Sequence, residues 1–218
     1  MSADDLRIAT ASAYDHIVDD FVRRNDTIPA DFAEFRATFV SAVRSAGGGG
    51  GRVVDLGCGP GRDAVHFLEN ALEVAGVDAS RQMAMHARGD GVPVVQADIR
   101  FVPLRSESLD GIWSAASLLH VPRPEVPLTL RGWRQLLRPT GVLGLSTSLG
   151  DDEGWEACPY DPSTQPVDTQ LRRWFVHHDD GALLALLDAA GFEVMSARER
   201  VSHRRWLQVL ARVKGRGL

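Results

Sequence analysis

The stretch Arg52-Val-Val-Asp-Leu-Gly-Cys-Gly-Pro-Gly-Arg-Asp63 decides the fold of this 218-residue chain. A short apolar run reaches Asp55, three alternating glycines follow (Gly57, Gly59 and Gly61), and a helix-like segment begins where the stretch ends. The pattern is typical of a buried strand, a tight turn and the start of a helix. Glycines at alternate positions permit positive φ and let a ligand lie directly against the backbone. The stretch therefore predicts a strand–turn–helix unit that binds a ligand.

The glycine spacing indicates which kind of ligand this turn accepts. A dinucleotide-binding turn places glycines at its first, third and sixth positions, so that a pyrophosphate rests on the helix N-terminus. Here the third glycine comes one residue early, and Arg62 takes the sixth position. Asp55, two residues before the first glycine, suits a cationic ligand better than a diphosphate. A nucleoside that carries an ammonium and a carboxylate fits this loop.

The rest of the chain alternates strand-like and helix-like segments, which predicts a parallel sheet with helices on both faces. A helix over 179–190 and two closely spaced strands, 192–200 and 205–213, follow and predict a terminal antiparallel hairpin. The alternating strands are expected at 52–56, 73–78, 92–97, 109–115 and 141–147, and the helices at 62–70, 80–88 and 124–138.

Two segments stand apart from this alternation. Residues 1–46 carry two amphipathic helical patterns, and the glycine run 47–51 behind them is typical of a linker. We therefore expect an N-terminal helical appendage (1–46) on a main domain (52–218). Residues 150–178 are long and proline-rich, which predicts a loop that closes over the ligand edge of the sheet.

The run Val54-Asp-Leu-Gly-Cys-Gly-Pro-Gly61 resembles the first motif of class I S-adenosylmethionine-dependent methyltransferases. Within them the chain is similar to the small-molecule group that includes methyltransferase type 11 and ubiquinone-biosynthesis-like enzymes. The resemblance covers residues 52–213 and implies an α/β, Rossmann-like, seven-stranded and mostly parallel sheet. It also implies S-adenosylmethionine as cofactor, with S-adenosylhomocysteine as product. For the loop alone, the alternative is a glycine-rich turn of another α/β protein.

In this family the glycine loop wraps the methionine half of the cofactor, the preceding acid holds its ammonium, and the N-terminal segment often covers the site. Open parallel sheets bind ligands at the carboxyl ends of their strands. Asp78 ends the second strand and could accept both ribose hydroxyls; the alternative is a cap of the next helix, a role that Ser80 can share. Met83 is expected beside the adenine unless it is a core methionine.

The family's adenine contacts fall on Asp98, which would accept from the amino group, and on the backbone of Ile99; the alternative for Asp98 is a turn aspartate. The backbone at Ser114 and Ala115 would border the methionine end. Arg62 could reach the cofactor carboxylate, with a solvated arginine as an equal alternative. The predicted cofactor-binding residues are Tyr14, Asp55, Gly57, Cys58, Gly59, Gly61, Arg62, Asp78, Ala79, Met83, Asp98, Ile99, Ser114 and Ala115.

Methyl transfer from a sulfonium needs a dedicated base only if the acceptor atom must lose a proton, and imidazole has a suitable pKa. His120, just after the fourth strand, is the best-placed candidate. His177 and His178 are adjacent, so only one of them can face the site, and His177 is the second candidate. The alternative for each is a structural histidine. No histidine pair has metal-ligand spacing on a helix, so we predict no metal.

Residues 150–178 supply the candidate acceptor site. Trp155, Tyr160 and Trp174 could wall an apolar pocket, and Arg172 or Arg173 could pair with a substrate carboxylate or phosphate. The predicted substrate residues are thus Trp155, Tyr160, Arg173 and Trp174. The equally weighted alternative is a solvated surface loop whose aromatic side chains pack locally.

Composition limits the function classes. The net charge of −5 argues against general nucleic-acid binding, no apolar run is long enough to span a bilayer, and two cysteines make no disulfide framework. We expect a cytoplasmic enzyme, monomeric or homodimeric, that methylates an O or N atom of a small molecule. Two alternatives stay open: an RNA or protein methyltransferase that uses the basic run 198–205, and a cofactor-binding module without chemistry.

Overall fold

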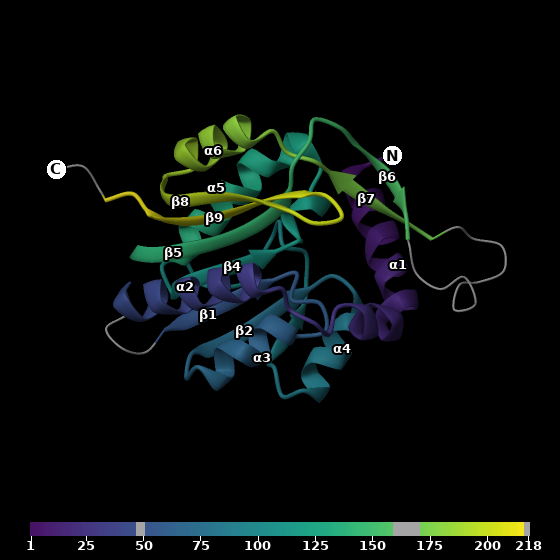
Figure 1. The fold of residues 1–218 in the computed structure, drawn as a ribbon, viewed down its shortest axis with the longest axis horizontal. Coiled ribbons are helices and arrows are strands. Elements are labelled where there is room, and N and C mark those ends of the chain that lie inside the picture. Colours follow the sequence, from purple (N-terminus) through teal and green to yellow (C-terminus); the bar gives the residue numbers. More distant parts are fainter. Residues whose placement is uncertain (47–50, 159–170, 216–218) are drawn as a thin grey trace.

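The computed structural model describes residues 1–46, 51–158 and 171–215, in which seven strands form one sheet in the order β3-β2-β1-β4-β5-β9-β8 (Figure 1). The first five strands of that order are parallel, whereas β9 runs antiparallel to both β5 and β8. The predicted Rossmann-like α/β fold with a terminal hairpin is confirmed. The strands are β1 (Arg52–Leu56), β2 (Glu73–Asp78), β3 (Val94–Gln96), β4 (Leu109–Ala115), β5 (Leu137–Ser148), β8 (Phe192–Val201) and β9 (Arg205–Val213).

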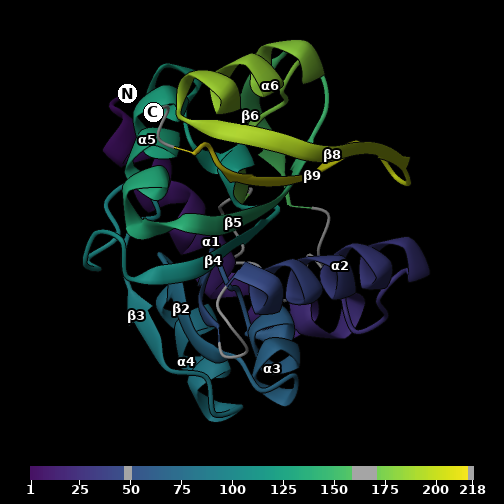
Figure 2. The same cartoon turned by 90° about the vertical axis from the view of Figure 1, so that its left-hand side faces the viewer.

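Helices cover both faces of the sheet, as Figures 1 and 2 show. One face carries α2 (Ala30–Ala46), α3 (Arg62–Glu69) and α4 (Arg81–Gly89), and the other carries α5 (Val126–Leu136) and α6 (Asp180–Ala189). The predicted helix over 124–138 begins with a 3-10 turn and ends at Leu136, because β5 starts at Leu137 rather than at position 141.

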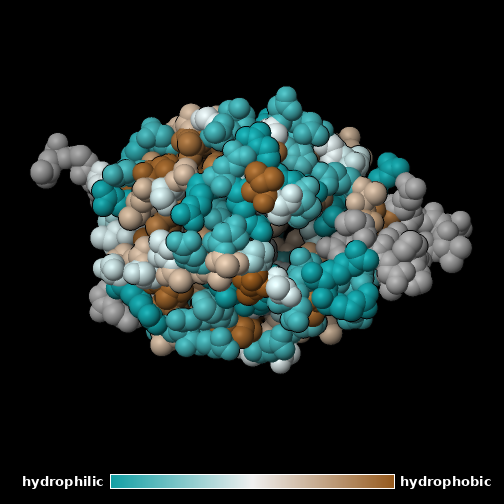
Figure 3. Space-filling view, in the orientation of Figure 1, coloured by the Kyte–Doolittle hydropathy of each residue, from teal (hydrophilic) through white to brown (hydrophobic). Residues whose placement is uncertain are grey.

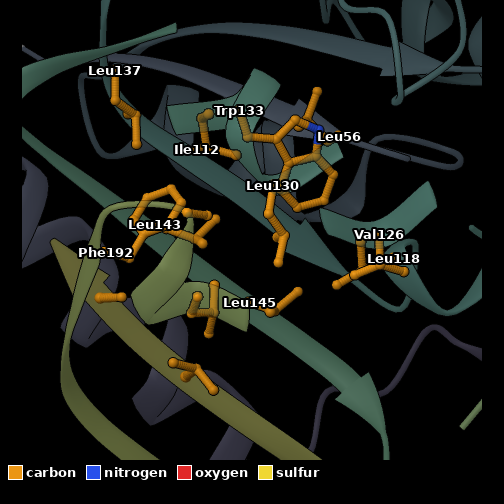
Figure 4. Packing of buried hydrophobic residues seen from close by; sticks show 14 of the residues in the cluster. Leu56, Ile112, Leu118, Val126, Leu130, Trp133, Leu137, Leu143, Leu145 and Phe192 are labelled. Carbon is orange, nitrogen blue, oxygen red and sulfur yellow. The ribbon is translucent and has the colours of Figure 1, made fainter. Parts of the chain in front are cut away.

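The larger hydrophobic core fills the space between the sheet and α5 and α6 (Figure 4). Trp133 of α5 and Phe192 of β8 are fully buried there against sheet residues such as Ile112 and Leu143. Burial of each such side chain contributes about 1.5–3 kcal/mol relative to leaving it exposed. This core fixes β4 and β5, the strands from which the functional edge projects.

The second core joins α2 to the opposite face of the sheet. Phe35 and Phe39 of α2 lie 4.9 and 5.0 Å from Trp113 of β4, measured between ring centroids. Phe39, Val43 and Trp113 are all fully buried. The helix α2, predicted as part of an appendage, therefore packs into the helical layer beside α3. The predicted linker lies largely outside the described residues, which omit 47–50.

The helix α1 (Ala3–Arg24) crosses the carboxyl edge of the sheet, where Figure 1 shows it beside β6 and β7. At its start, Asp4 receives a hydrogen bond from Arg100 at 2.5 Å. Further along, Asp15 accepts from the Ser80 hydroxyl at 2.6 Å and from the Gln82 N–H at 2.9 Å, at the N-terminus of α4. Side chains from several sheet segments thus hold α1 over the strand ends.

Part of the predicted loop 150–178 is a two-stranded antiparallel ribbon, β6 (Glu153–Ala157) and β7 (Arg172–Val176). Trp155 and Trp174 lie directly opposite each other, 5.4 Å apart in an edge-to-face arrangement. Such a cross-strand aromatic pair stabilises a ribbon by roughly 0.2–1 kcal/mol. Neither Glu153–Ala157 nor Arg172–Val176 alternates regularly between exposed and buried residues, so the sequence carried no clear signal of a ribbon.

The surface in Figure 3 is mostly hydrophilic, with hydrophobic residues scattered over it. Within the described ranges, every helix is too short or too polar to cross a bilayer.

Candidate functional site

A cavity of about 910 Å³ opens at the carboxyl ends of β1, β2 and β4. The glycine loop, the exit of β2 and the exit of β4 form one end of its wall. The helix α1, the strand β7 and the β8–β9 turn form the other end. The volume lies in the range that accommodates drug-sized ligands. We call the two parts the strand end and the hairpin end.

Backbone geometry fixes the glycine loop at the strand end. Gly57 has φ 72°, its N–H donates to the Val77 carbonyl at 2.7 Å, and an added Cβ would lie 2.3 Å from the Ser117 Cβ. Gly59 has φ 55°, and its N–H donates to Asp78 at 2.8 Å. An added Cβ on Gly59 would meet no atom within 4 Å, so its outer side is open.

The other members of the loop divide between the cavity and the fold. Cys58 and Arg62 line the cavity, whereas Gly61 faces α4, where an added Cβ would lie 2.8 Å from the Ala87 Cβ. The structure therefore places Gly61, a predicted cofactor contact, in helix packing. Arg62 lines the cavity, donates to the Asn25 carbonyl at 2.9 Å and lies over the Phe32 ring. It ties the α1–α2 connection to the loop.

Two carboxylates lie under the loop. Asp55 is buried, and its pKa is raised well above its usual range by desolvation and by the negative charges of Asp63 and Asp78. Asp78 lines the cavity and accepts the Gly59 N–H through one oxygen and the Ser80 N–H through the other, each at 2.8 Å. Burial raises the pKa of Asp78 to about 6, although the two N–H donors oppose the shift. The cap of α4 is Ser80 itself, which accepts from the Met83 N–H.

The exits of β2 and β3 form the next part of the strand end. Ala79, Met83 and Ile99 all line the cavity. The Ile99 carbonyl accepts from Trp133 Nε1 at 2.7 Å, which anchors this turn to the core. The structure thus brings together every predicted residue of the adenine side, with the buried Met83 serving both the core and the cavity.

Asp98 lines the cavity within a cluster of ion pairs that the sequence did not indicate. One oxygen accepts the Arg100 N–H at 2.9 Å, and the other accepts from the Arg100 guanidinium at 2.6 and 2.9 Å and lies 3.1 Å from Arg7. Arg100 also pairs with Asp4 and Glu125. A ligand amino group would therefore share Asp98 with two arginines.

At the exit of β4, the two predicted residues separate. Ala115 lines the cavity. Ser114 is fully buried, its hydroxyl lies 2.7 Å from the Ser117 hydroxyl, and it does not belong to the cavity wall. The prediction concerned the backbone of Ser114, and a backbone contact with the cofactor there stays a prediction.

At the hairpin end, Tyr14, His120 and Arg173 form a chain of hydrogen bonds. His120 Nδ1 lies 2.5 Å from the Trp174 carbonyl, which accepts only, so the ring proton resides on Nδ1 and Nε2 accepts from the Tyr14 hydroxyl at 2.9 Å. Arg173 donates to the Tyr14 oxygen at 3.1 Å. Burial, reinforced by the positive charge of Arg173, lowers the pKa of His120 to about 3, despite the opposing bond to Trp174.

Three further residues predicted for catalysis or the acceptor do not line the cavity: His177, Trp155 and Trp174. His177 bonds to Ser148 and Glu156, at 2.9 and 2.8 Å, so both of its ring nitrogens have partners in the fold. Trp155 and Trp174 contact each other on the opposite face of the ribbon from Arg173. Tyr160 lies outside the described residues. Because side chains alternate along a strand, Arg173 and Trp174 could not both face one pocket.

Several cavity residues escaped the sequence reasoning, chiefly Phe175 of β7 and the residues of the β8–β9 turn. Phe175 lies two residues after Arg173, so recognition of β7 as a strand would have placed both on one face. The turn residues carried no local signal, because only the folded hairpin brings them to the cavity. They are Arg200, Ser202, His203, Arg204 and Trp206.

The sheet order, the antiparallel edge and the glycine loop at the strand ends define a class I methyltransferase fold. Residues 53–141 match the family model described as a methyltransferase domain. This part of the chain, which holds the glycine loop, is therefore similar to the S-adenosylmethionine-dependent methyltransferases that its first motif resembles.

Among curated proteins, the chain is similar to a malonyl-[acyl-carrier protein] O-methyltransferase of Enterobacter lignolyticus. The two are 33% identical over 118 residues, which cover 51% of this chain and 46% of that protein. Among solved structures it is similar to the 1,6-didemethyltoxoflavin-N1-methyltransferase of Burkholderia thailandensis, determined with S-adenosylhomocysteine. That match has a TM-score of 0.72 and 20% identity, over 98% of this chain and 91% of the other.

A third neighbour shows that the fold carries more than one activity. The [4+2]-cyclase SpnF matches with a TM-score of 0.61 and 21% identity, over 82% of this chain and 81% of that chain. At such identities the likeness concerns the fold. The function must therefore be argued from the site.

Proposed function

We propose that this protein transfers a methyl group from S-adenosylmethionine to an O or N atom of a small-molecule acceptor. One observation carries the proposal. The glycine loop, Asp78 and the Ile99 turn meet at one end of a cavity that has room for a second ligand at its other end.

The residues at the strand end fit the cofactor. The open side of Gly59 leaves space for a ligand against the backbone. Each oxygen of Asp78 has accepted one N–H, and a carboxylate oxygen can accept more than one hydrogen bond. Asp78 is therefore suited to two ribose hydroxyls, and the buried Asp55 lies behind the loop where a cationic amino group would compensate it.

When bound, S-adenosylmethionine supplies an electrophilic methyl group on its sulfonium sulfur. The chain's part is to bind, align and exclude water, since a well-aligned nucleophile about 3–3.5 Å from the methyl carbon gains several kcal/mol from orientation alone. The strand end fixes one reactant through backbone groups, and α1 covers the cavity from above.

His120 is suited to positioning more than to accepting a proton. Its Nε2 is occupied by the Tyr14 hydroxyl, and its pKa of about 3 makes the imidazolium costly. We propose that His120 holds Tyr14 in place and that direct proton acceptance requires Tyr14 to move away. An acceptor that reacts in its unprotonated form needs no such step.

Calorimetric titration with S-adenosylhomocysteine tests the cofactor assignment, and absence of binding would sink it. Methyl transfer is then tested by mass spectrometry on a panel of small acids, phenols and amines, where a methylated product and S-adenosylhomocysteine must form together. Tyr14→Phe should leave cofactor affinity within about threefold, because Tyr14 lies at the hairpin end.

The two alternative functions, an RNA or protein methyltransferase and a cofactor-binding module without chemistry, predict different experimental results. Arginines of the basic run 198–205 pair with Glu34, Asp31, Glu156 and Glu199, which neutralises a footprint for RNA. Salt-sensitive RNA binding would nevertheless restore that function. Cofactor binding without any methylated product across the panel would favour a module without methyl-transfer chemistry. A cytoplasmic location and a monomeric or homodimeric state remain predictions.

A further inference from the structure

We infer that Trp206 and Gln208 of β9 bind a carbonyl oxygen of an uncharged, planar acceptor, with the Ser146 hydroxyl beside them. The inference rests on the proposed function, because it names the substrate class that would occupy the same cavity. Two observations carry it. Trp206 and Gln208 each hold a buried N–H donor that has no hydrogen-bond partner among the described residues, and the strand register sets both side chains at the cavity wall.

The register of β5 and β9 brings these side chains to one face of the sheet. Gln208 lies directly opposite Ser146, and Trp206 lies opposite Ser148. Residues two apart on a strand share a face, and directly opposite residues of antiparallel strands have Cβ atoms about 4.5–5.5 Å apart. Ser146 and Trp206 both line the cavity. Gln208, two residues from Trp206 and opposite Ser146, therefore lies against the cavity wall.

Ser146 also borders the strand end of the cavity. It pairs with Ala115 in the parallel register of β4 and β5, and its carbonyl accepts the Ala116 N–H at 2.8 Å. Ala115 and Ala116 line the cavity at the exit of β4, where the resemblance to methyltransferases implies the methionine end of the cofactor. A ligand held by Ser146 and Gln208 would thus lie next to the half of the cofactor that carries the methyl group.

The two N–H donors are not used within the described fold. Gln208 is 3% exposed, and its Nε2 has no hydrogen-bond partner within 1–46, 51–158 and 171–215. Trp206 Nε1 is likewise buried and unpartnered within those ranges. Buried N–H donors without partners are destabilising, and native proteins leave few of them. An indole nitrogen and an amide nitrogen only donate, so the group that suits both is an acceptor such as a carbonyl oxygen.

The arginines that line the hairpin end are each engaged by another residue of the fold. Their partners are Tyr14 for Arg173, Asp31 for Arg200 and Glu156 for Arg204. A buried carboxylate needs a partner of opposite charge, whereas a carbonyl oxygen needs only a hydrogen-bond donor. Trp206 and Gln208 supply donors without charge. An uncharged carbonyl group therefore matches them better than a carboxylate or a phosphate does.

Aromatic surface beside the donors favours a planar acceptor. Phe175 and Trp206 both line the cavity, and the His203 ring lies 5.8 Å from the Trp206 ring, measured between centroids. Aromatic side chains bury large apolar areas and pack against other rings in offset or edge-to-face arrangements. A carbonyl group on a planar body would use both the surface and the N–H donors.

The test compares acetophenone with ethylbenzene, which keeps the ring but replaces the carbonyl by a methylene group. Affinities for the full chain are measured by ligand-observed NMR in the parent protein, in Gln208→Leu and in Trp206→Phe. Each substitution removes one N–H donor and keeps an apolar side chain. The readout is the ratio of the two affinities, because the ratio removes the contribution of the shared ring. We expect this ratio to fall about fivefold in each variant, the usual effect of one hydrogen bond between uncharged groups.

Gln135→Leu is the matched control, because Gln135 is exposed on α5 and lies outside the cavity wall. It should leave the ratio within about twofold of the parent value. Urea unfolding of Gln208→Leu gives a second readout. Its stability should equal or exceed that of the parent, because the substitution removes a buried donor that lacks a partner in the described ranges. A clear loss of stability would mean that the amide serves the fold, and would overturn the inference.

The binding data can overturn the inference in three further ways. These are binding of neither probe to the parent, an unchanged ratio in either folded variant, and tighter binding of benzoate than of acetophenone to the parent. If circular dichroism shows that Trp206→Phe does not fold, Gln208→Leu decides alone.

S-adenosylhomocysteine titrated into the same samples separates the carbonyl subsite from the proposed function. An unchanged ratio with intact S-adenosylhomocysteine binding overturns the carbonyl subsite alone. A reduced ratio in the variants without S-adenosylhomocysteine binding overturns the proposed methyl transfer alone.

Discussion

The two ends of the cavity are built differently. The strand end consists of backbone turns at the exits of parallel strands, and its hydrogen bonds run mainly between main-chain groups and Asp78. The hairpin end consists of side chains from α1, β7 and the β8–β9 turn, held by hydrogen bonds between residues far apart in sequence. A backbone-built end tolerates little change, whereas a side-chain-built end can be altered residue by residue. Substitutions at the hairpin end could therefore change which acceptor binds without disturbing the strand end.

The largest expected effect concerns Gly57. Gly57→Ala places a Cβ 2.3 Å from the Ser117 Cβ at a positive φ, so we expect a loss of about 3 kcal/mol in unfolding free energy and loss of S-adenosylhomocysteine binding. Gly59→Ala is the matched variant, since its Cβ meets open space. It should lower the free energy of unfolding by only about 1 kcal/mol, while still reducing the affinity for S-adenosylhomocysteine. Urea unfolding and calorimetry check both, and equal stability of the two variants would contradict this geometry.

Asp78→Asn should have the next largest effect. Loss of the charge-assisted bonds to ribose should lower cofactor affinity about tenfold to a hundredfold. In the unsubstituted protein, affinity should fall as pH drops below about 6, because the carboxyl then takes up a proton. The variant should lack this pH dependence. Asp151→Asn makes the same chemical change at an exposed site outside the cavity wall and should bind normally; weakened binding there would implicate general charge instead of Asp78.

At the hairpin side of the molecule, buried histidines should make stability sensitive to acid. Burial lowers the pKa of His178 to about 4, whereas an unfolded histidine titrates near 6.5. Below that pH the unfolded chain binds more protons, so stability falls as pH decreases from about 6.5 towards 4. His178→Asn should reduce this slope by about 1.4 kcal/mol per pH unit.

Asp78 acts with the opposite sign, because its raised pKa lets the native state bind a proton first. The comparison between parent and variant cancels that contribution. Unfolding in urea at several pH values measures the slopes, which should coincide at pH about 7–8, where neither state of His178 changes protonation. If the stability of the parent protein and of His178→Asn changes with pH at the same slope below pH about 6.5, His178 is not a buried neutral imidazole.

The smallest effect is expected where α1 meets α4. Asp15→Ala removes the acceptor for the Ser80 hydroxyl and the Gln82 N–H, which should cost about 1 kcal/mol. Hydrogen exchange of α1 amides should accelerate, while exchange in β1 and β4 stays unchanged. Asp19→Ala on the same helix is the control. Uniform acceleration across the sheet would show that α1 does not open separately.

The difference between the ends also explains what the sequence could reveal. Gly57, Asp78 and Ile99 were recognisable because each lies at or within three residues of a strand's carboxyl end, and parallel strands bring these ends together. Arg204 and Trp206 could not be assigned, because their place depends on how the hairpin packs. Trp174 was assigned to the same pocket as Arg173, against the two-residue period of their strand. Asp98 was placed correctly at the cavity, but its arginine partners come from α1 and a neighbouring turn.

One helix, α1, bonds to both ends of the cavity: Asp15 reaches Ser80 at the strand end, and Tyr14 reaches His120 and Arg173 at the hairpin end. Two ligands that bind beneath the same helix would enter and leave by the same route. We therefore expect either product to leave by the same movement of α1, and the rate of that movement would set an upper limit on turnover. A substitution that weakens α1 could therefore raise turnover even while it lowers stability.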